Sequence, residues 1–181
     1  EKCIVYNTIQ MYRHDRLFFL EECLKKAKKS NISYGIKLVR GAYMEKERKR
    51  SEDMGYPSPI QPNKEATDRD YDIALDYILK NINYLSLVAG THNEHSSKKL
   101  ALSLEKHNIS KDDSRIFFAQ LLGMSDHISF NLADHNYNVA KYVPFGPIKE
   151  VMPYLLRRAD ENTSVAGQTG RELGLIKSEL Q

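Results

Sequence analysis

The sequence has no tryptophan, only two cysteines and no glycine-rich nucleotide-binding loop. Cys3 and Cys23 cannot build a disulfide framework, so nothing in the cysteine content indicates secretion. No apolar run approaches the ~18 residues that a membrane helix needs. Neither a G-x-G-x-x-G nor a Walker pattern occurs. These absences argue against a disulfide-stapled module, a membrane-spanning helix within these residues, and a Rossmann or P-loop nucleotide site.

The charge balance is also unremarkable. The 181 residues carry a formal net charge of +3, with 28% charged and 41% hydrophobic residues. A charge this small and this evenly spread does not favour a nucleic-acid partner. Apolar residues recur from end to end, which excludes low-complexity disorder and is enough to bury a core. We therefore expect a globular domain without a nucleic-acid partner.

The first residues are unusual for the start of a domain. The sequence begins at Glu1 without an initiator methionine, and within three residues it enters the β-branched and aromatic run Ile4–Ile9. Such a run favours a strand. No leader or capping turn precedes it, so we expect the sequence to open in the middle of a fold.

Hydrophobic periodicity along the chain alternates between strand and helix patterns. Strands are predicted over residues 4–9, 36–39, 85–89, 116–119 and 137–143, and helices over 15–29, 45–53, 68–82, 96–107, 147–162 and 171–180. The alternation repeats about five times without hairpin signals, and this is typical of a parallel sheet or barrel. In such folds the chemistry gathers where strands end and the next loops begin.

The predicted strand ends are rich in polar and aromatic residues. They carry Gln10, Arg40 to Tyr43, Gly90 to Glu94, Gln120 and Tyr142. Side chains of this kind at five successive ends suggest the lining of one site. Solvated loops with a few helix caps are the alternative, and the pattern alone does not exclude them.

Two further clusters can each be interpreted as a binding site or as an ordinary structural feature. Arg157 and Arg158 could bind a carboxylate through paired hydrogen bonds, or could form a basic helix surface paired with Glu161 at i+3 or i+4. The stretch from His92 to His95 could suggest a metal, but it lacks the downstream Cys-x-x-Cys of zinc deaminases and the H-E-x-x-H spacing. Metal binding is therefore the weaker hypothesis, and His92 is expected either to donate a hydrogen bond to a ligand or to be a structural histidine with its hydrogen bonds satisfied.

Several long motifs, in order and covering nearly the whole chain, resemble the proline dehydrogenase family. They are residues 37–48 (KLVRGAYMEKER), 55–60 (GYPSPI), 91–94 (THNE), 118–124 (FAQLLGM), 141–147 (KYVPFGP) and 154–162 (YLLRRADEN). The resemblance implies an FAD-dependent (βα)8 barrel, a TIM-type α/β fold. It also implies oxidation of L-proline to Δ1-pyrroline-5-carboxylate by hydride transfer to FAD, with the electrons passed to a membrane quinone.

The resemblance also implies how much of the barrel is present. It covers strands four to eight and a C-terminal helix, so residues 1–181 would be the C-terminal portion of a single catalytic barrel. The strands before these would come from a missing N-terminal half-barrel, and five βα units cannot close an eight-stranded barrel. The resemblance further implies a cytoplasmic or peripheral inner-membrane location in a bacterium and a mitochondrial one in a eukaryote.

Individual roles are implied position by position. For the cofactor, the matching residues are Gln10, Lys37, Val39, Gly41, Ala42, Lys64, Thr91 and His92, with Lys37 near the reactive nitrogen of the flavin. For the substrate, they are Leu38, Tyr43, Tyr142, Tyr154, Arg157, Arg158 and Glu161. Among these, the ones closest to the chemistry are Lys37, Tyr142, Arg157 and Arg158. The arginine pair would hold the proline carboxylate, Glu161 would pair with it, and Leu38 and the tyrosines would wall the ring.

Two other functions stay open at this point. A truncated chain could act as a non-catalytic complementing subunit of such an enzyme. A metal-dependent barrel hydrolase using His92 and His95 is the weaker alternative.

Overall fold

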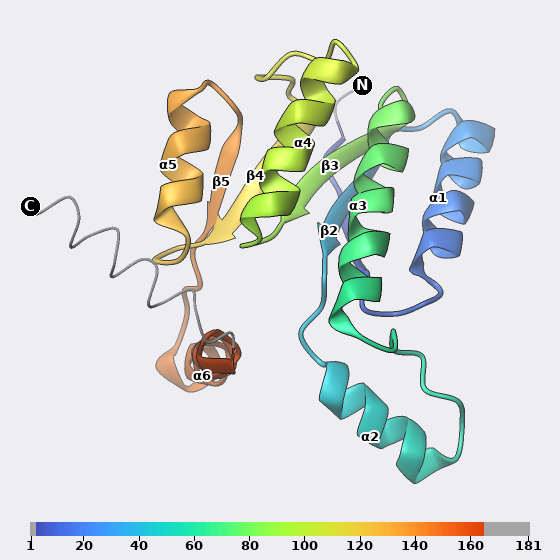
Figure 1. Ribbon diagram of the computed structural model, residues 1–181, viewed down its shortest axis with the longest axis vertical. Coiled ribbons are helices and arrows are strands. Elements are labelled where there is room, and N and C mark those ends of the chain that lie inside the picture. The colour runs from blue at the N-terminus through green and yellow to red at the C-terminus, as the bar shows by residue number, and fades with distance from the viewer. Residues whose placement is uncertain (1–2, 165–181) are drawn as a thin grey trace, which may run out of the picture.

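The computed structural model describes residues 3–164, and side chains from residue 3 to residue 158 (Figure 1). Strands and helices alternate as the sequence predicts. In chain order the elements are β1 (Tyr6–Gln10), α1 (Arg16–Ser30), β2 (Tyr34–Val39), α2 (Met44–Met54), α3 (Lys64–Lys80), β3 (Leu85–Gly90), α4 (Glu94–Lys106), β4 (Ile116–Leu121), α5 (Asp126–Asp134), β5 (Val139–Tyr142) and α6 (Ile148–Ser164). The helix predicted over 171–180 lies outside the described residues.

The five strands form one parallel sheet in the order β1-β2-β3-β4-β5. Each strand pairs with the next one along the chain, for example Thr8 with Lys37 and Lys37 with Val88. Parallel neighbours of this kind need a crossover, and the intervening helices supply it. The fold is therefore α/β, with consecutive βα units of the type that build a (βα)8 barrel.

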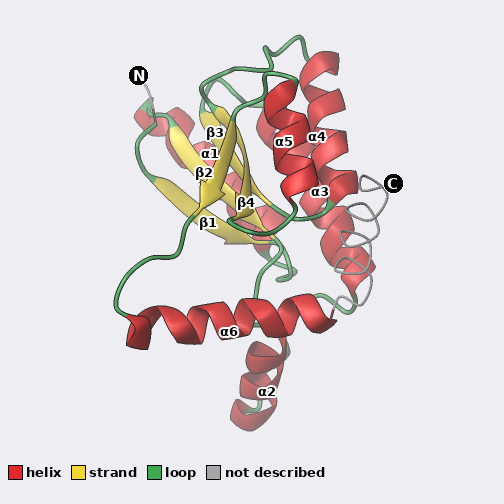
Figure 2. Cartoon of the chain, turned by 90° about the vertical axis from the view of Figure 1, so that its left-hand side faces the viewer, coloured by secondary structure: helices red, strands yellow, loops and turns green. Residues whose placement is uncertain are grey.

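The hydrophobic core lies between the sheet and the helices α1, α3, α4 and α5, which cover one of its faces (Figures 1 and 2). Ile36 and Leu38 of β2 are fully buried there, together with Tyr71 and Ile78 of α3. Burying one such side chain contributes about 1.5–3 kcal/mol. The helical layer thus fixes which residues of each strand face inward.

The opposite face of the sheet carries no helix among residues 3–164. Successive side chains of a strand point to opposite faces, so Lys37 and Val39 of β2 lie on this open face and are only half-buried. Gln10 pairs with Val39 and shares its face. The residues expected to contact a cofactor from the strands therefore lie on the side that the helices leave uncovered.

Two helices begin earlier than the sequence pattern predicts. The α3 helix begins at Lys64 rather than near residue 68, because the side-chain oxygen of Asn63 accepts a hydrogen bond from the Ala66 amide at 2.8 Å. The Asn93 side chain does the same for the Ser96 amide at 3.0 Å, so α4 begins at Glu94. Asparagine caps satisfy backbone donors that the first helical turn leaves free.

The helix α5 was not predicted from the sequence. It is only nine residues long, and a segment this short gives a weak periodic signal. The longer α6 lies across the molecule below the sheet (Figure 2). None of the helices within residues 3–164 is long and apolar enough to cross a lipid bilayer.

Candidate functional site

A contact across the open face joins two strands that are not neighbours in the sheet. The Nζ atom of Lys37 on β2 lies 5.4 Å from the ring centroid of Tyr142, the last residue of β5. The strands β3 and β4 lie between them in the sheet order. Lys37 and Tyr142, both expected close to the chemistry, are thus brought together by the tertiary structure.

Helix α6 adds aromatic and cationic groups to this pair. The ring of Tyr154 packs edge-to-face on that of Tyr142, with centroids 5.8 Å apart and planes at 72°. The guanidinium carbon of Arg158 lies 5.3 Å from the Tyr154 ring centre. Edge-to-face rings and a cation over a ring each contribute roughly 0.5–1.5 kcal/mol. The two tyrosines and Arg158 therefore form one continuous group with Lys37.

Arg157 points to a different aromatic ring. Its guanidinium carbon lies 6.0 Å from the ring centre of Tyr43, which follows the turn after β2. Adjacent helical residues are rotated by about 100°, and this explains why Arg157 and Arg158 contact different partners. Five of the seven residues expected to bind substrate are thus near one end of the sheet.

Of the remaining two substrate-side residues, Leu38 is not part of this group. Leu38 is fully buried in the core with the helices, because strand alternation turns it away from the face that carries Lys37. Leu38 therefore lies on the side of the sheet that the helices cover. Residue 161 is helical in α6, but the side chain of Glu161 lies outside the described residues.

The turn after β2 is closely packed against the segment that follows β1. Gly41 has a φ of +121°, and a Cβ atom at this position would lie 1.5 Å from Cδ1 of Tyr12. The Tyr12 hydroxyl donates a hydrogen bond to Glu47 of α2. Burial, with this hydrogen bond, raises the pKa of Tyr12 well above its usual value. Gly41 and the neighbouring Ala42 thus belong to a turn whose shape is fixed by close packing.

The turn after β3 is held by hydrogen bonds of its own. The Thr91 hydroxyl accepts from Nη1 of Arg40 at 2.9 Å and from the Asn93 amide at 3.1 Å. Nδ1 of His92 lies 3.0 Å from the Ser125 hydroxyl. Thr91 and His92 therefore lie at the same end of the sheet as Arg40 and the turn after β2.

Lys64 lies at the start of α3 and is largely exposed. It pairs with Asp68, which also accepts a hydrogen bond from Arg40. Burial raises the pKa of the Asp68 carboxyl, but the hydrogen bonds from Lys64 and Arg40 outweigh it and hold the pKa below its usual value. Lys64 is thus connected to the strand ends through Asp68.

The histidines do not assemble into a metal site in the described part of the chain. His92 contacts Ser125, whereas Nε2 of His95 lies 3.9 Å from Asp72. Within that part, no group of three or more histidine, cysteine or acidic residues is arranged to hold an ion.

Sequence reasoning missed the residues that hold the strand ends together. Arg40 was noted only as a strand-end residue, and Asp68, Tyr12 and Ser125 received no role. Their positions at strand ends or helix starts were the only indication in the sequence that they could have such a role. Gln120 also differs from its expected surroundings, because it is buried and bonds to Thr91 and Ser129.

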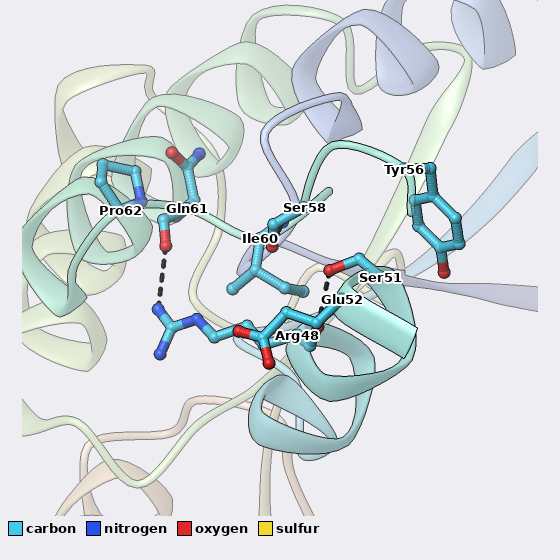
Figure 3. Close-up of a pocket in the computed structure, with 8 residues that line it drawn as sticks. All are labelled: Arg48, Ser51, Glu52, Tyr56, Ser58, Ile60, Gln61 and Pro62. Carbon is cyan, nitrogen blue, oxygen red and sulfur yellow. Dashed lines mark hydrogen bonds between the residues drawn. The ribbon is translucent and has the colours of Figure 1, made fainter. Parts of the chain in front are cut away.

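A separate cavity of about 400 Å³ lies between α2 and the loop that follows it (Figure 3). Its lining residues are Arg48, Ser51, Glu52, Tyr56, Ser58, Ile60, Gln61 and Pro62. Figure 3 shows Arg48 extending to the Gln61 carbonyl, to which Nη2 donates at 3.1 Å. None of the cofactor-binding or substrate-binding residues expected from the sequence lines this cavity, and Arg48 holds the loop in place.

Comparison with known proteins identifies relatives of the whole chain. Residues 1–171 match the family profile described as Proline dehydrogenase. The chain is 40% identical over 183 residues to human "Proline dehydrogenase 1, mitochondrial", covering 99% of this chain and 30% of the relative. It is 40% identical to the "Hydroxyproline dehydrogenase" of Xenopus laevis, covering 98% of this chain and 39% of the relative. The chain thus spans less than two fifths of the length of these relatives.

Solved structures show the same architecture. The chain superimposes with a TM-score of 0.84 and 32% identity on proline utilization A (PutA) of Bdellovibrio bacteriovorus, in a structure described as inactivated by N-propargylglycine. The match covers 89% of this chain and 17% of that one. A PutA variant of Bradyrhizobium japonicum matches with a TM-score of 0.78 at 25% identity, covering 89% of this chain and 16% of that one.

Proposed function

Because the chain belongs to the proline dehydrogenase family, we propose that it forms the C-terminal portion of a (βα)8 barrel that oxidises L-proline to Δ1-pyrroline-5-carboxylate. The gathering of Lys37, Tyr142, Tyr154 and Arg158 at one end of the sheet is the observation that most directly supports this. It combines a cation, an aromatic wall and an anion-binding group in one place.

The open face of the sheet suits a flat, electron-accepting ring system such as a flavin. Val39 and Gly90 pack closely, since a Cβ atom on Gly90 would come within 3.0 Å of Cγ1 of Val39. Because Gly90 has no side chain, the sheet surface is flat at this point. The Lys37 side chain lies beside it, with Cε 3.7 Å from the position that a Cβ atom on Gly90 would occupy. Lys37 would stabilise negative charge that develops beside it.

FAD, when bound, supplies the acceptor for the hydride that leaves proline. The residues that would hold it are Gln10, Lys37, Val39, Gly41, Ala42, Lys64, Thr91 and His92. Gln10 and Val39 are register partners at the ends of β1 and β2. Thr91 and His92 follow the neighbouring β3.

The substrate is held by groups from α6 and from the turn after β2. Arg157 and Arg158 would bind the proline carboxylate, for which guanidinium groups are suited by shape and charge. The rings of Tyr43, Tyr142 and Tyr154 would exclude water around the proline ring and fix its orientation. The identity to a hydroxyproline dehydrogenase makes hydroxyproline a competing substrate worth testing alongside proline.

We also propose that the remaining barrel comes from an N-terminal half-barrel. The five-stranded sheet has its edges at β1 and β5, and unpaired edge strands are open to further pairing. Three more βα units between these edges would close an eight-stranded barrel. The electrons would then pass to a membrane quinone, through peripheral membrane contact at the bacterial inner membrane or within the mitochondrion.

The test compares the 181-residue chain alone with the chain joined to, or mixed with, the N-terminal half-barrel. The joined protein should be yellow with a flavin spectrum and should reduce a dye in the presence of proline, whereas the isolated chain should not turn over. Sedimentation should show the two halves associating.

Three outcomes would contradict the proposal in whole or in part. Association without flavin uptake or proline-dependent reduction would favour a complementing subunit without activity. Stoichiometric metal in a colourless protein would favour the hydrolase instead. Robust turnover by the isolated chain would overturn the requirement for the half-barrel.

A further inference from the structure

Arg40, the residue directly after β2, joins several elements through one side chain. Its Nε donates to Asp68 of α3 at 2.5 Å, its Nη1 to Thr91 after β3 at 2.9 Å, and its Nη2 to Ser96 of α4 at 2.9 Å. The guanidinium carbon also lies 4.3 Å from the ring centre of the buried Tyr71. All three nitrogens of the guanidinium group therefore have a defined partner.

The contacts of Arg40 differ from a surface ion pair in their burial and in the geometry that they require. The Arg40 side chain is only about one-fifth exposed (21%). Charge-assisted hydrogen bonds are roughly twice as strong as neutral ones. The planar fork of arginine reaches partners in three directions and stacks on a ring, and the point charge of lysine cannot reproduce this geometry. The site thus specifies arginine by shape as well as by charge.

Arg40 itself belongs to the turn after β2, and its partner Thr91 belongs to the turn after β3; the proposed function places both turns against the flavin. Its backbone carbonyl accepts from the Tyr12 amide at 2.7 Å, which holds the turn after β2. Thr91, which it contacts through the side chain, also accepts from the Asn93 amide and so shapes the start of α4. One side chain therefore connects the turn containing Gly41 with the turn containing Thr91.

We infer that Arg40 is a positioning residue of the cofactor site, which fixes the turns after β2 and β3 relative to each other without contacting the substrate. This inference rests on the proposed function for its ligand, FAD. Its geometric part, the rigid connection between the two turns, stands on the contacts of the chain itself.

The test uses the complete protein that contains this chain, with Arg40→Lys as the main variant. The matched control is Arg115→Lys. Arg115 is also a partly buried arginine, with Nε and Nη2 donating to Asp113 at 2.9 and 2.5 Å, but it lies at the amino end of β4, away from the proposed site. Both changes remove an arginine fork and retain the positive charge.

Two measurements are made on each variant. The first is the Kd for FAD, and Arg40→Lys should raise it about tenfold or more while Arg115→Lys leaves it within twofold. The second is amide hydrogen exchange without FAD, in which residues 40–43 and 91–93 should exchange faster in Arg40→Lys only.

The outcomes separate this inference from the proposed function. If the unaltered protein binds FAD and Arg40→Lys binds it equally well, the positioning role is wrong and the proposed function stands. If the unaltered protein takes up no FAD, the proposed function fails, and hydrogen exchange alone decides on Arg40. Unchanged exchange at residues 91–93 then overturns the connection between the turns.

Discussion

The ammonium group of Lys37 on β2 contacts the ring of Tyr142 on β5, 5.4 Å from its centroid, across two intervening strands. In a flat sheet, three strand spacings of about 4.8 Å would place the two strands about 14 Å apart, with parallel side chains. The contact therefore means that the sheet curls, as a barrel wall does, and that its open face is concave. Curvature of the sheet is what gathers the proposed site.

Removing the Lys37 charge should slow the reduction of the flavin by proline. In the complete protein we expect Lys37→Met to lower this rate about 10²-fold, the loss typical when one group that stabilises developing charge is removed. The control is Lys98→Met on the exposed surface of α4, which should leave the rate unchanged. Stopped-flow absorbance of the flavin measures both, and equal rates would exclude Lys37 from this role.

Removing Arg157 should weaken proline binding more than flavin binding. A hydrogen bond to a charged group contributes roughly 1.5–3 kcal/mol, so Arg157→Ala should raise the apparent KM for proline about 10- to 100-fold. Lys149→Ala, an exposed cation on the same helix, should change KM less than twofold. Steady-state kinetics with a dye acceptor decides, and an unchanged KM in Arg157→Ala would refute the assignment.

Substituting Gly41 should destabilise the fold through a steric clash as well as through backbone strain. Gly41→Ala places a methyl group onto the Tyr12 ring at a φ of +121°. Gly55→Ala is the control, because Gly55 has a φ of +70° but nothing within 4 Å of the added atom. Backbone strain alone costs about 1–2 kcal/mol.

In urea denaturation, Gly41→Ala should therefore lower the free energy of unfolding by at least about 1 kcal/mol more than Gly55→Ala does. Similar losses for the two variants would mean that Tyr12 moves aside freely. Flavin binding should also fall in Gly41→Ala only.

Acid should remove part of the stability through Asp113. Hydrogen bonds from the Arg115 guanidinium hold the pKa of Asp113 below its ordinary value of 3.8. A carboxyl whose pKa is lower in the folded state stabilises the fold above pH ~4 and loses this contribution as the pH falls through the folded value. The free energy of unfolding should therefore decline on acidification.

Asp113→Asn should be less stable at neutral pH and should show a shallower decline in acid. Asp53→Asn, at an exposed position on α2, should follow the unaltered protein. Urea titrations at a series of pH values measure the slopes, and identical slopes for Asp113→Asn and the unaltered protein would contradict the prediction.

Much of the fold follows from the sequence by itself. The alternation of β-rich and helical periods predicts the parallel sheet, because local hydrophobic patterns report which face of an element is buried. The motifs at the strand ends indicate the proline dehydrogenase family, which the comparisons confirm. Helix starts were less well predicted, since the caps at Asn63 and Asn93 act through single hydrogen bonds rather than through periodicity.

Only the tertiary structure decided which of these residues meet. Sequence spacing could not place Lys37 against Tyr142, because that contact depends on sheet curvature and strand order. It could not turn Leu38 into the core or give Arg40 its three partners, since both depend on how strands and helices pack. The sequence determines which chemical groups each strand end and helix carries. The packing of the sheet and its helices determines which of these distant side chains come into contact.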